Sequence, residues 1–585
     1  MKPKKKNMSN ISVTCFGAGA EVGRSSILVE ISGKKVLLDC GVNFSNEPKD
    51  RLPRFPDENM NIDVVLVSHI HSDHLAAVPY LTEVKKCNAP VYMSKASHLM
   101  MPIMLKDYLK VTDRPPYSFE DLNSCLEKIR PIEFYSRIEA VKDVYIQAFP
   151  AGHIIGACMF YVSVKGRSFV YTGDYSSIAD HHLNGCSIPK LYPDLLLTES
   201  TYGNRIRESI AIRKKSLVQL VHSVVSNGGK VLIPVFAVGR FHEICLMLEE
   251  FWARMGYTEP IYYHTYMGEK AITIYKKCIR WMNPTVQTAY FDENKSFFKF
   301  EYTKPYDRSR PIYGGCVMLA TSGMLSYNSN AFKFFVTDGW HKDPKNLILF
   351  PGYCGPNTFG RAVLERPDSN SVHYVDSEKK AEVDIVVKCQ VQSISFSAHA
   401  DQFEIVSLCE QLCPHYVGTI HGDLDAVSTL TKKIMESTKS HSFVPQNCST
   451  HSIKEKDMKK VYIEKDCIQF LYDEPSSFEG ALVKANHFKI MKTKTVANLN
   501  GISIRELIIN RRIHSKLTYK DIAQILASMG LLSPDKLSNP TDTIITPAFT
   551  VRFTESGVRI RYSMKDKQIA NMFSSLIEKR SNTYV

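Results

Sequence analysis

The sequence lacks several patterns that would place it in common protein classes. None of its 15 cysteines forms a Cys-x-x-Cys pair, which predicts reduced, buried thiols in a cytosolic or nuclear protein rather than a disulfide scaffold. No apolar run approaches the roughly 18 residues of a membrane span, and no signal-peptide core follows Met1–Lys6. We find no internal repeat and no extended low-complexity segment. A chain of 585 residues without these features is expected to fold into about two to four globular domains.

The charge balance is basic. A formal net charge of +13 suits a polyanionic partner, although ordinary solvation of the surface explains such an excess equally well. Four lysines lie within the first six residues. They are interpreted either as a nuclear-import signal or as a solvated, disordered tail.

Four metal-ligand side chains follow one apolar run. Val64–Ser68 predicts a buried strand, and His69, His71, Asp73 and His74 come directly after it. Alternate residues of an extended segment project to the same side, so the first two histidines can share one ion while the other two residues bind a second ion beside it. Imidazole and carboxylate ligands are typical of zinc and leave an open position for water. The alternative is a polar loop that caps the strand end.

Three further ligand-type residues also stand at the ends of apolar runs. His153, Asp174 and His421 each have a glycine neighbour, which lets the backbone pass close to a crowded centre. Each motif alone fits an ordinary turn. Together they predict one ion held by His69, His71, His153 and Asp174, and a second held by Asp73, His74, Asp174 and His421. Asp174 would bridge the two ions.

Seven motifs in order resemble those of the metallo-β-lactamase-fold nucleases that carry a β-CASP domain. They are Val36–Gly41, His69–His74, Ala151–His153, Tyr171–Asp174, Glu199–Gly203, Ser397–Asp401 and His421–Gly422. The resemblance covers roughly residues 11 to 450. Three more segments, Gly17–Ser25, Phe251–Met255 and Pro351–Cys354, look most like the Integrator-type endonucleases of this family, with the cleavage-and-polyadenylation endonucleases next.

The resemblance implies the fold class: α/β, a metallo-β-lactamase αββα sandwich with an inserted β-CASP α/β domain and a small α+β C-terminal domain. The expected boundaries are 11–201 and 386–460 for the sandwich, 202–385 for the β-CASP domain and 461–585 for the C-terminal domain. Because proposed ligands lie on both sides of the insertion, the chain must leave the first domain and return to it. A flexible single strand would reach the metals through the cleft between the two domains.

The resemblance also implies the chemistry. Two Zn²⁺ ions would hydrolyse phosphodiester bonds of RNA to 5′-phosphate and 3′-hydroxyl ends, in nuclear RNA 3′-end processing. The other functions considered are a small-molecule metallo-hydrolase and a non-catalytic paralogue. The inserted β-CASP domain, called the cassette below, and the Ser397–Asp401 motif oppose a small-molecule hydrolase. The intact ligand set opposes a non-catalytic paralogue.

Catalytic roles are expected for three residues, His399, Glu199 and Asp73. His399 would donate a proton to the leaving oxygen, and Glu199 would keep that imidazole protonated and aimed. Asp39 would fix a ligand histidine by hydrogen bonding. Candidates for phosphate contacts are Arg240, Lys304, Arg308 and Arg361. Three cassette segments depart from the usual family pattern, namely Ala320–Leu325, Tyr353–Thr358 and Phe236–Glu243.

The tail has its own pattern. Thr518 is a predicted helix N-cap, followed by an apolar face at Ile522, Ile525 and Leu526, with Gly530 as a stop. Two alternating runs around residues 548–562 predict a hairpin, and a last helix is expected over about 565–579. Arginines on the hairpin could contact RNA. A module that pairs with another chain is equally consistent, and the family resemblance favours pairing with an inactive β-CASP paralogue within a larger RNA-processing complex.

Overall fold

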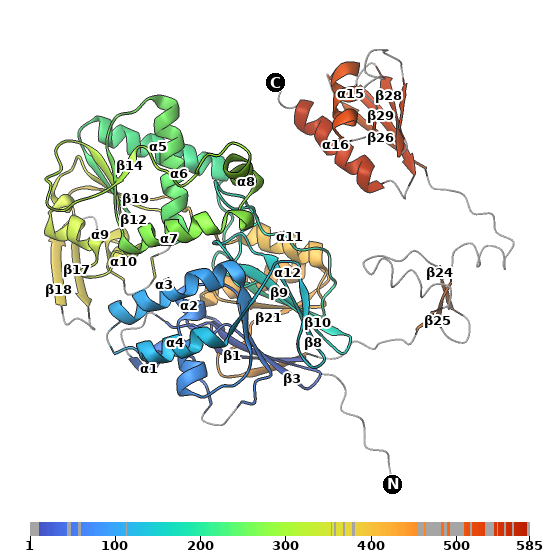
Figure 1. Ribbon diagram of the computed structural model, residues 1–585, viewed down its shortest axis with the longest axis horizontal. Coiled ribbons are helices and arrows are strands. Elements are labelled where there is room, and N and C mark those ends of the chain that lie inside the picture. The colour runs from blue at the N-terminus through green and yellow to red at the C-terminus, as the bar shows by residue number, and fades with distance from the viewer. Residues whose placement is uncertain are drawn as a thin grey trace, which may run out of the picture. The chain divides into compact units, whose positions relative to one another are not determined.

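The chain divides into two compact units, Met1–Glu455 and Lys456–Val585, in this computed structural model (Figure 1). Each unit is described by itself. The structure describes residues 11–43, 48–56, 60–112, 114–352, 354–355, 358–366, 369–376 and 381–453 of the first unit, and 461–463, 481–484, 488–491, 508–514, 517–529, 531–532, 543–546, 548–554, 557–563 and 567–581 of the second. The lysines of the first six residues and Gly530 lie outside these ranges. In the part of the chain so described, no helix is long and apolar enough to cross a membrane.

Two mixed seven-stranded sheets form the base of the first unit. The first sheet has the order β22 (Thr450–Ile453), β1 (Ile11–Gly17), β2 (Ser26–Ile31), β3 (Lys34–Leu38), β4 (Val64–Val67), β5 (Val91–Ser94) and β6 (Ile129–Ile132). The second has the order β21 (His441–Phe443), β20 (Tyr416–Ile420), β11 (Leu195–Glu199), β10 (Arg167–Tyr171), β9 (Cys158–Val164), β8 (Val144–Pro150) and β7 (Arg137–Val141).

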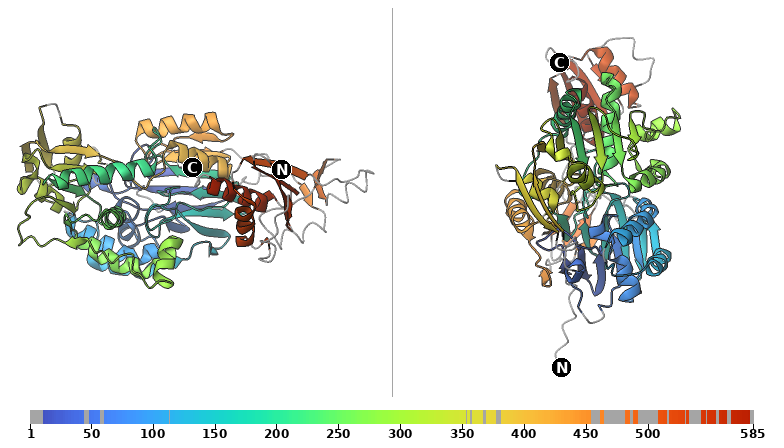
Figure 2. Two further views of the ribbon diagram at one scale, coloured as in Figure 1. Left: turned by 90° about the horizontal axis from the view of Figure 1, so that it is seen from above. Right: turned by 90° about the vertical axis from the view of Figure 1, so that its left-hand side faces the viewer.

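The two sheets stack through one apolar layer and carry helices on their outer faces. Side chains such as Val29 and Leu66 of the first sheet pack with Phe160 and Leu197 of the second, all fully buried. Helices α3 (Lys95–Val111) and α4 (Phe119–Lys128) lie on the outer face of the first sheet. Helices α11 (Gln402–Leu412) and α12 (Leu424–Ser437) lie on the outer face of the second sheet (Figure 2, left). The predicted αββα sandwich is therefore confirmed. Short helices α1 (Pro48–Arg51), α2 (Ser72–Leu75) and η1 (Tyr80–Val84) connect the strands of the first sheet.

An inserted α/β layer forms the second half of this unit. Its six strands are all parallel, in the order β14 (Thr303–Pro305), β13 (Ile261–His264), β15 (Cys316–Ala320), β12 (Lys230–Pro234), β16 (Leu347–Phe350) and β19 (Gln390–Ser393). Apolar clusters cover both faces of the sheet, which is why its central strands are continuously hydrophobic. The surrounding elements are α5 (Ile210–Ser226), α6 (Arg240–Met255), α7 (Tyr266–Lys277), η2 (Ile279–Trp281), α8 (Pro284–Phe291), α9 (Asn330–Phe332), η3 (Lys333–Thr337), η4 (Trp340–Lys342), α10 (Phe359–Leu364) and the hairpin of β17 (Ser371–Asp376) and β18 (Ala381–Val386).

The chain crosses between the sandwich and this inserted layer twice, at neighbouring points. The outgoing segment and the returning one meet in an isolated β-bridge between Tyr202 and Asp401, and Gln402 N donates to Arg205 O at 3.1 Å. Helix α5 begins only at Ile210, where the Ser209 side chain caps it. The intervening residues form the crossing itself.

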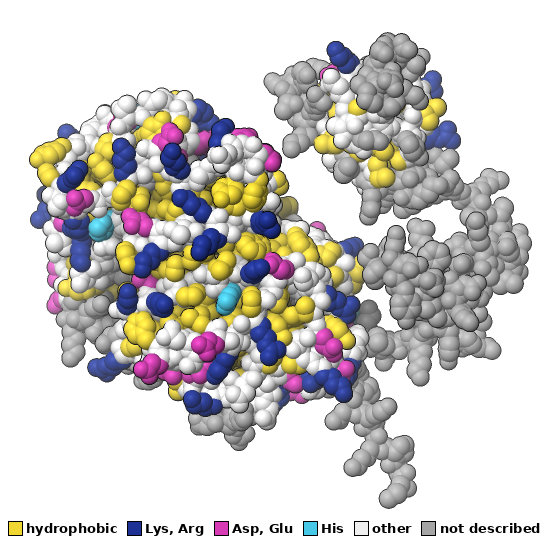
Figure 3. All heavy atoms as spheres, in the orientation of Figure 1, with side chains coloured by type: hydrophobic (Ala, Val, Ile, Leu, Met, Phe, Trp, Pro, Cys, Tyr) yellow, Lys and Arg dark blue, Asp and Glu magenta, His cyan; other side chains and the backbone are white. Residues whose placement is uncertain are grey.

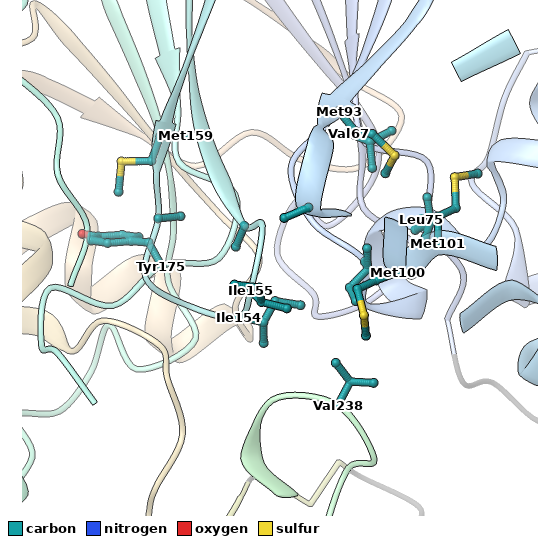
Figure 4. Close-up of a cluster of buried hydrophobic side chains, with 14 of the residues drawn as sticks. Val67, Leu75, Met93, Met100, Met101, Ile154, Ile155, Met159, Tyr175 and Val238 are labelled. Carbon is teal, nitrogen blue, oxygen red and sulfur yellow. The ribbon is translucent and has the colours of Figure 1, made fainter. Parts of the chain in front are cut away.

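A loop of the inserted layer packs on the sandwich. Val238, between β12 and α6, lies near Ile154 and Met100 in one buried cluster (Figure 4). Gly239 has φ 84°, and a Cβ there would come 2.8 Å from Ile154 Cγ2. Since Ile154 directly follows His153, this contact joins the inserted layer to a loop that carries a predicted ligand.

The described residues of the second unit form two small sheets. One is β23 (Val461–Ile463), β25 (Phe488–Met491) and β24 (Ala481–Lys484); the other is β26 (Ile508–His514), β29 (Gly557–Ser563), β28 (Phe549–Thr554) and β27 (Thr543–Ile545). Helix α15 (Tyr519–Ser528) has Thr518 as its N-cap, as predicted, and Asp521 completes a capping box; Ile522 and Leu526 of the helix are buried. The predicted hairpin is β28–β29, and the last helix, α16, spans Lys567–Ser581, two residues later than expected.

Candidate metal centre

Ends of strands from both sheets of the sandwich converge on one point. The predicted ligands of residues 69–74 follow β4, and His153, Asp174 and His421 follow β8, β10 and β20, respectively. Because β9 is antiparallel to both β8 and β10, these two strands run in the same direction, and β10, β11 and β20 are parallel. Their carboxyl ends therefore share one edge. His421 has φ 52° and Asp39 has φ 58°, a backbone conformation that is costly for non-glycine residues and concentrates at functional sites.

A first group of donors consists of His69, His71, His153 and Asp174, whose ligand atoms all lie within 4.8 Å of one another. His71 Nδ1 lies 3.2 Å from His69 Nε2 and 3.0 Å from His153 Nε2. Zinc–nitrogen bonds of about 2.0–2.1 Å in a tetrahedral site place ligand atoms about 3.3–3.4 Å apart. The separations of these nitrogens are close to that value.

A second group consists of Asp73, His74 and His421. His421 Nε2 lies 3.3 Å from both His74 Nε2 and Asp73 Oδ2. Asp174 adjoins both groups, since its Oδ2 lies 3.4 Å from His74 Nε2 and 3.6 Å from His69 Nε2. One carboxylate is thus within reach of both groups of histidines.

The charge states of the first group suit a cation. Burial lowers the pKa of His71 to about 4 and holds the pKa values of His69 and His153 well below the ordinary range, so these imidazoles are neutral and keep a lone pair at neutral pH. Burial opposes ionisation of Asp174, but the neighbouring histidines outweigh it and its pKa is lowered. Its Oδ1 is buried without a hydrogen-bond partner. Neutral imidazoles facing one another beside an ionised carboxylate with an orphaned oxygen form a donor set that a divalent cation satisfies.

Asp39 ties the second group to both sheets. Its Oδ2 accepts hydrogen bonds from His74 Nδ1 at 2.7 Å and Tyr171 Oη at 2.5 Å, and its Oδ1 accepts from Ser68 N at 2.6 Å. Asp39 is fully buried. The bond to Nδ1 keeps that nitrogen protonated and orients the ring, so that Nε2 faces His421 and is the nitrogen of His74 that can bind a metal.

His399 and Glu199 also meet, at the edge of the two groups. His399 Nδ1 lies 2.7 Å from Glu199 Oε2, and the opposite oxygen accepts from Tyr175 N at 2.8 Å. Burial lowers the pKa of His399, but the carboxylates of Glu199 and Asp174 together outweigh it and the net shift is upward. The imidazole side chain is 16% exposed, so it is reachable from solvent while its carboxylate partner is buried.

Two side chains that sequence reasoning missed support this pair. Thr201 Oγ1 donates to Glu199 Oε2 at 2.7 Å and lies 3.2 Å from His421 Nδ1, so it links the carboxylate to the second group. Arg207, in the outgoing segment, donates to the carbonyls of Ser397 and His399. Thr201 stands within the Glu199–Gly203 motif and could have been found there. No pattern in the sequence marks Arg207, because its partners lie about 190 residues away.

The four predicted phosphate-contact residues have different surroundings. Arg240 donates to Phe396 O and pairs with Asp180 at 3.2 Å, Arg308 pairs with Asp338 at 2.8 Å, and Arg361 pairs with Glu365. Lys304 is exposed on β14. On the face of the first unit seen in Figure 3, basic side chains alternate with acidic and apolar ones instead of forming one stripe. Their role in RNA binding stays a prediction.

Another group of ligand-type residues, Asp180, His182 and Glu243, lies where the sandwich meets α6. Here Arg240 pairs with Asp180, and Lys214 lies 3.7 Å from Glu243. The cations already present balance these carboxylates. This group is therefore explained as an ionic contact between the two halves of the unit.

Comparisons with known proteins agree with this architecture. The chain matches the metallo-beta-lactamase superfamily domain over residues 28–197, the Beta-Casp domain over 241–363, and the Zn-dependent metallo-hydrolase RNA specificity domain over 384–445. It is 32% identical to Integrator complex subunit 11 of Gallus gallus over 98% of this chain and 99% of that protein. It is 31% identical to cleavage and polyadenylation specificity factor subunit 3-II of Arabidopsis thaliana (97% and 93%), and 33% identical to endoribonuclease YSH1 of Candida glabrata (76% and 60%).

The hydrogen bonds of Asp39 give a first prediction. In Asp39→Asn the amide cannot replace a carboxylate that accepts four hydrogen bonds, two from Ser68 and one each from His74 and Tyr171, so the ring of His74 is no longer held in place. We expect zinc affinity, measured by competition with a chromogenic chelator, to fall by about 10- to 100-fold. Tyr171→Phe is the matched control, because it removes one donor and leaves the carboxylate; its affinity should fall less. Equal zinc affinity in Asp39→Asn and the wild type would contradict the positioning role.

Proposed function

This chain belongs to the metallo-β-lactamase/β-CASP family, and on that premise we propose that it is a zinc-dependent RNA endonuclease of the Integrator type. The observation that carries the proposal is the pair of donor groups that share Asp174, next to an inserted cassette. Its place would be the nucleus, in RNA 3′-end processing, within a multi-subunit complex. The runner-up is the endonuclease of pre-mRNA cleavage and polyadenylation, since relatives of that name are also similar over most of the chain.

Two zinc ions fit the donor set. His69, His71, His153 and Asp174 would hold one ion, and Asp73, His74, His421 and Asp174 the other. When bound, such ions lower the pKa of a water molecule and neutralise charge that develops on a phosphate. Asp73, whose side chain is 17% exposed, would orient the attacking water.

The protein's own proton donor would be His399. Hydrolysis that yields a 5′-phosphate and a 3′-hydroxyl breaks the bond between phosphorus and the 3′ oxygen, and that oxygen needs a proton as it leaves. The Glu199 carboxylate favours the charged imidazole and holds Nδ1, which leaves Nε2 to deliver the proton. Arg207 supports the backbone of His399 and so positions this donor without touching the substrate.

A small-molecule hydrolase on the same scaffold is the competing function. A small-molecule hydrolase needs the two donor groups, but it needs neither the cassette nor a proton donor such as His399 at the edge of those groups. The contact of Val238 with the loop that carries His153 favours the nuclease, because it makes the cassette part of the site's own support.

Loss of the second donor group should abolish cleavage. Asp73→Ala/His74→Ala removes two proposed ligands of one ion, and purified protein with zinc should no longer cut labelled single-stranded RNA. The control is His373→Ala/Asp384→Ala, which removes an exposed His–Asp pair 2.7 Å apart on the β17–β18 hairpin. Cleavage by the first variant at the wild-type rate would rule out the two-metal site.

Loss of His399 should slow cleavage while the metal stays bound. In His399→Ala, single-turnover cleavage should fall by about 10²- to 10⁴-fold, the usual contribution of a general acid. Zinc content, measured by elemental analysis, should match that of the wild type and of the His373→Ala control. Zinc lost in proportion to activity would instead identify His399 as a ligand.

The second unit is expected to carry the partner interface. Its edge strands, and the exposed Ile569 and Leu576 of α16, offer surfaces that an inactive paralogous chain could cover. Deleting residues 461–585 should abolish co-purification of that paralogue and leave zinc bound to the first unit. Recovery of the paralogue with the shortened chain would move the interface elsewhere.

A further inference from the structure

The four-stranded sheet of the second unit has two unlike faces. One face packs on the helices α15 and α16 through Val551, Ile560 and Phe573, which are fully buried. Residues that alternate with these along β28 and β29 project from the opposite face.

Arginines gather on the second face. Arg552 of β28 and Arg559 of β29 are direct cross-strand partners, and Arg561 lies two residues further along the same side of β29. The residue opposite Arg559 on β26 is also an arginine, Arg512. The side chains of Arg552, Arg559 and Arg561 are all exposed.

This arrangement is uncompensated within the sheet. Like charges directly opposite one another on neighbouring strands destabilise a sheet. None of the strands β26, β27, β28 and β29 contains an aspartate or glutamate. Among the described residues, no ion pair joins Arg552, Arg559 or Arg561 to an acidic group. The sheet therefore tolerates a repulsion that an anionic ligand would relieve.

We propose that this arginine face binds the phosphodiester backbone of single-stranded RNA, as a second contact outside the metal centre. The inference rests on the proposed RNA endonuclease function. A guanidinium group binds phosphate oxygens with two parallel hydrogen bonds. Because neighbouring strands lie about 4.8 Å apart, the arginines of β28 and β29 place such groups side by side on an exposed surface. A flat row of cations of this kind suits an extended polyanion better than a single small anion.

The chemistry of the face also indicates how it would act. Contacts to phosphates fix position and carry no sequence information, so the face would hold RNA of any sequence. A second binding module raises the effective concentration of RNA at the first site and strengthens overall binding. The partner surfaces on the sheet edges and on α16 are separate from this face, so both kinds of binding are compatible.

The test compares two triple variants of the full chain with equal loss of charge. Arg552→Gln/Arg559→Gln/Arg561→Gln removes the arginine face, and Lys432→Gln/Lys433→Gln/Lys439→Gln removes three exposed lysines on or next to α12. Binding of a fluorescent, non-cleavable 2′-O-methyl RNA of about 20 nucleotides is measured by anisotropy over a range of salt concentrations. Three phosphate contacts on a single strand contribute about 2 to the slope of log affinity against log salt.

We expect the arginine variant to bind more weakly and to lose about 2 from that slope, with a smaller change in the lysine variant. A third variant, with lysine at the same three positions, should keep most of the slope and shows that the sheet still folds. Equal slopes in the arginine and lysine variants would overturn the proposal. If the arginine variant bound RNA as tightly as the wild type but no longer co-purified with the paralogous chain, the proposal would be overturned and the face would be a protein-binding surface.

Cleavage is measured separately on the same proteins. If the wild type binds RNA through the arginine face but cuts none, the endonuclease function fails and the RNA-binding face stands. If the wild type cuts RNA and the arginine variant binds it as tightly, only the RNA-binding face fails.

Discussion

The candidate centre depends on the hydrogen bonds that the buried carboxylate of Asp39 accepts. Asp39 stands at the end of β3 and accepts hydrogen bonds from the loop after β4, from α2 and from β10, which belongs to the other sheet. The two sheets are otherwise joined mainly by apolar side chains, with a few further hydrogen bonds such as that from Tyr92 Oη of β5 to Ala140 O of β7. A fully buried carboxylate is stable only with its hydrogen bonds in place, so its donors fix the relative position of the sheet edges. The crowding of histidine side chains around Asp174 requires that fixed geometry.

The inserted cassette is part of the same mechanical unit. Its two chain crossings meet at Tyr202 and Asp401, and Arg207 in the first crossing holds the backbone of His399 in the second. On the other side Val238 packs against Ile154. Both contacts bear on residues next to the donor groups. A shift of the cassette would therefore displace His399 and the loop of His153 before it moved the other donors.

Much of the centre could be predicted because its residues follow short, local patterns. His69 to His74 come directly after an apolar strand, and His153, Asp174 and His421 stand beside glycines at strand ends. The fold class and the family resemblance are confirmed, whereas the ligand assignments remain predictions. Arg207 could not be predicted, since its function depends on a contact between distant segments, and neither could the start of α5 at Ile210. β9 is antiparallel to both β8 and β10, and only the three-dimensional register reveals that these two strands end at one edge.

The position of the cassette within the chain has a consequence for synthesis on the ribosome. His69, His71, His153 and Asp174 have all been made before the cassette begins, but His421 follows Asp174 by roughly 250 residues. At about 5–20 residues per second, that interval lasts on the order of 10–50 s. During this time a nascent chain holds one donor group complete and the other without its last histidine. The proposed second ion can thus bind to its full set of ligands only after the cassette has been synthesised. A chain whose synthesis stalled within the cassette would lack His421 and so have an incomplete second donor group.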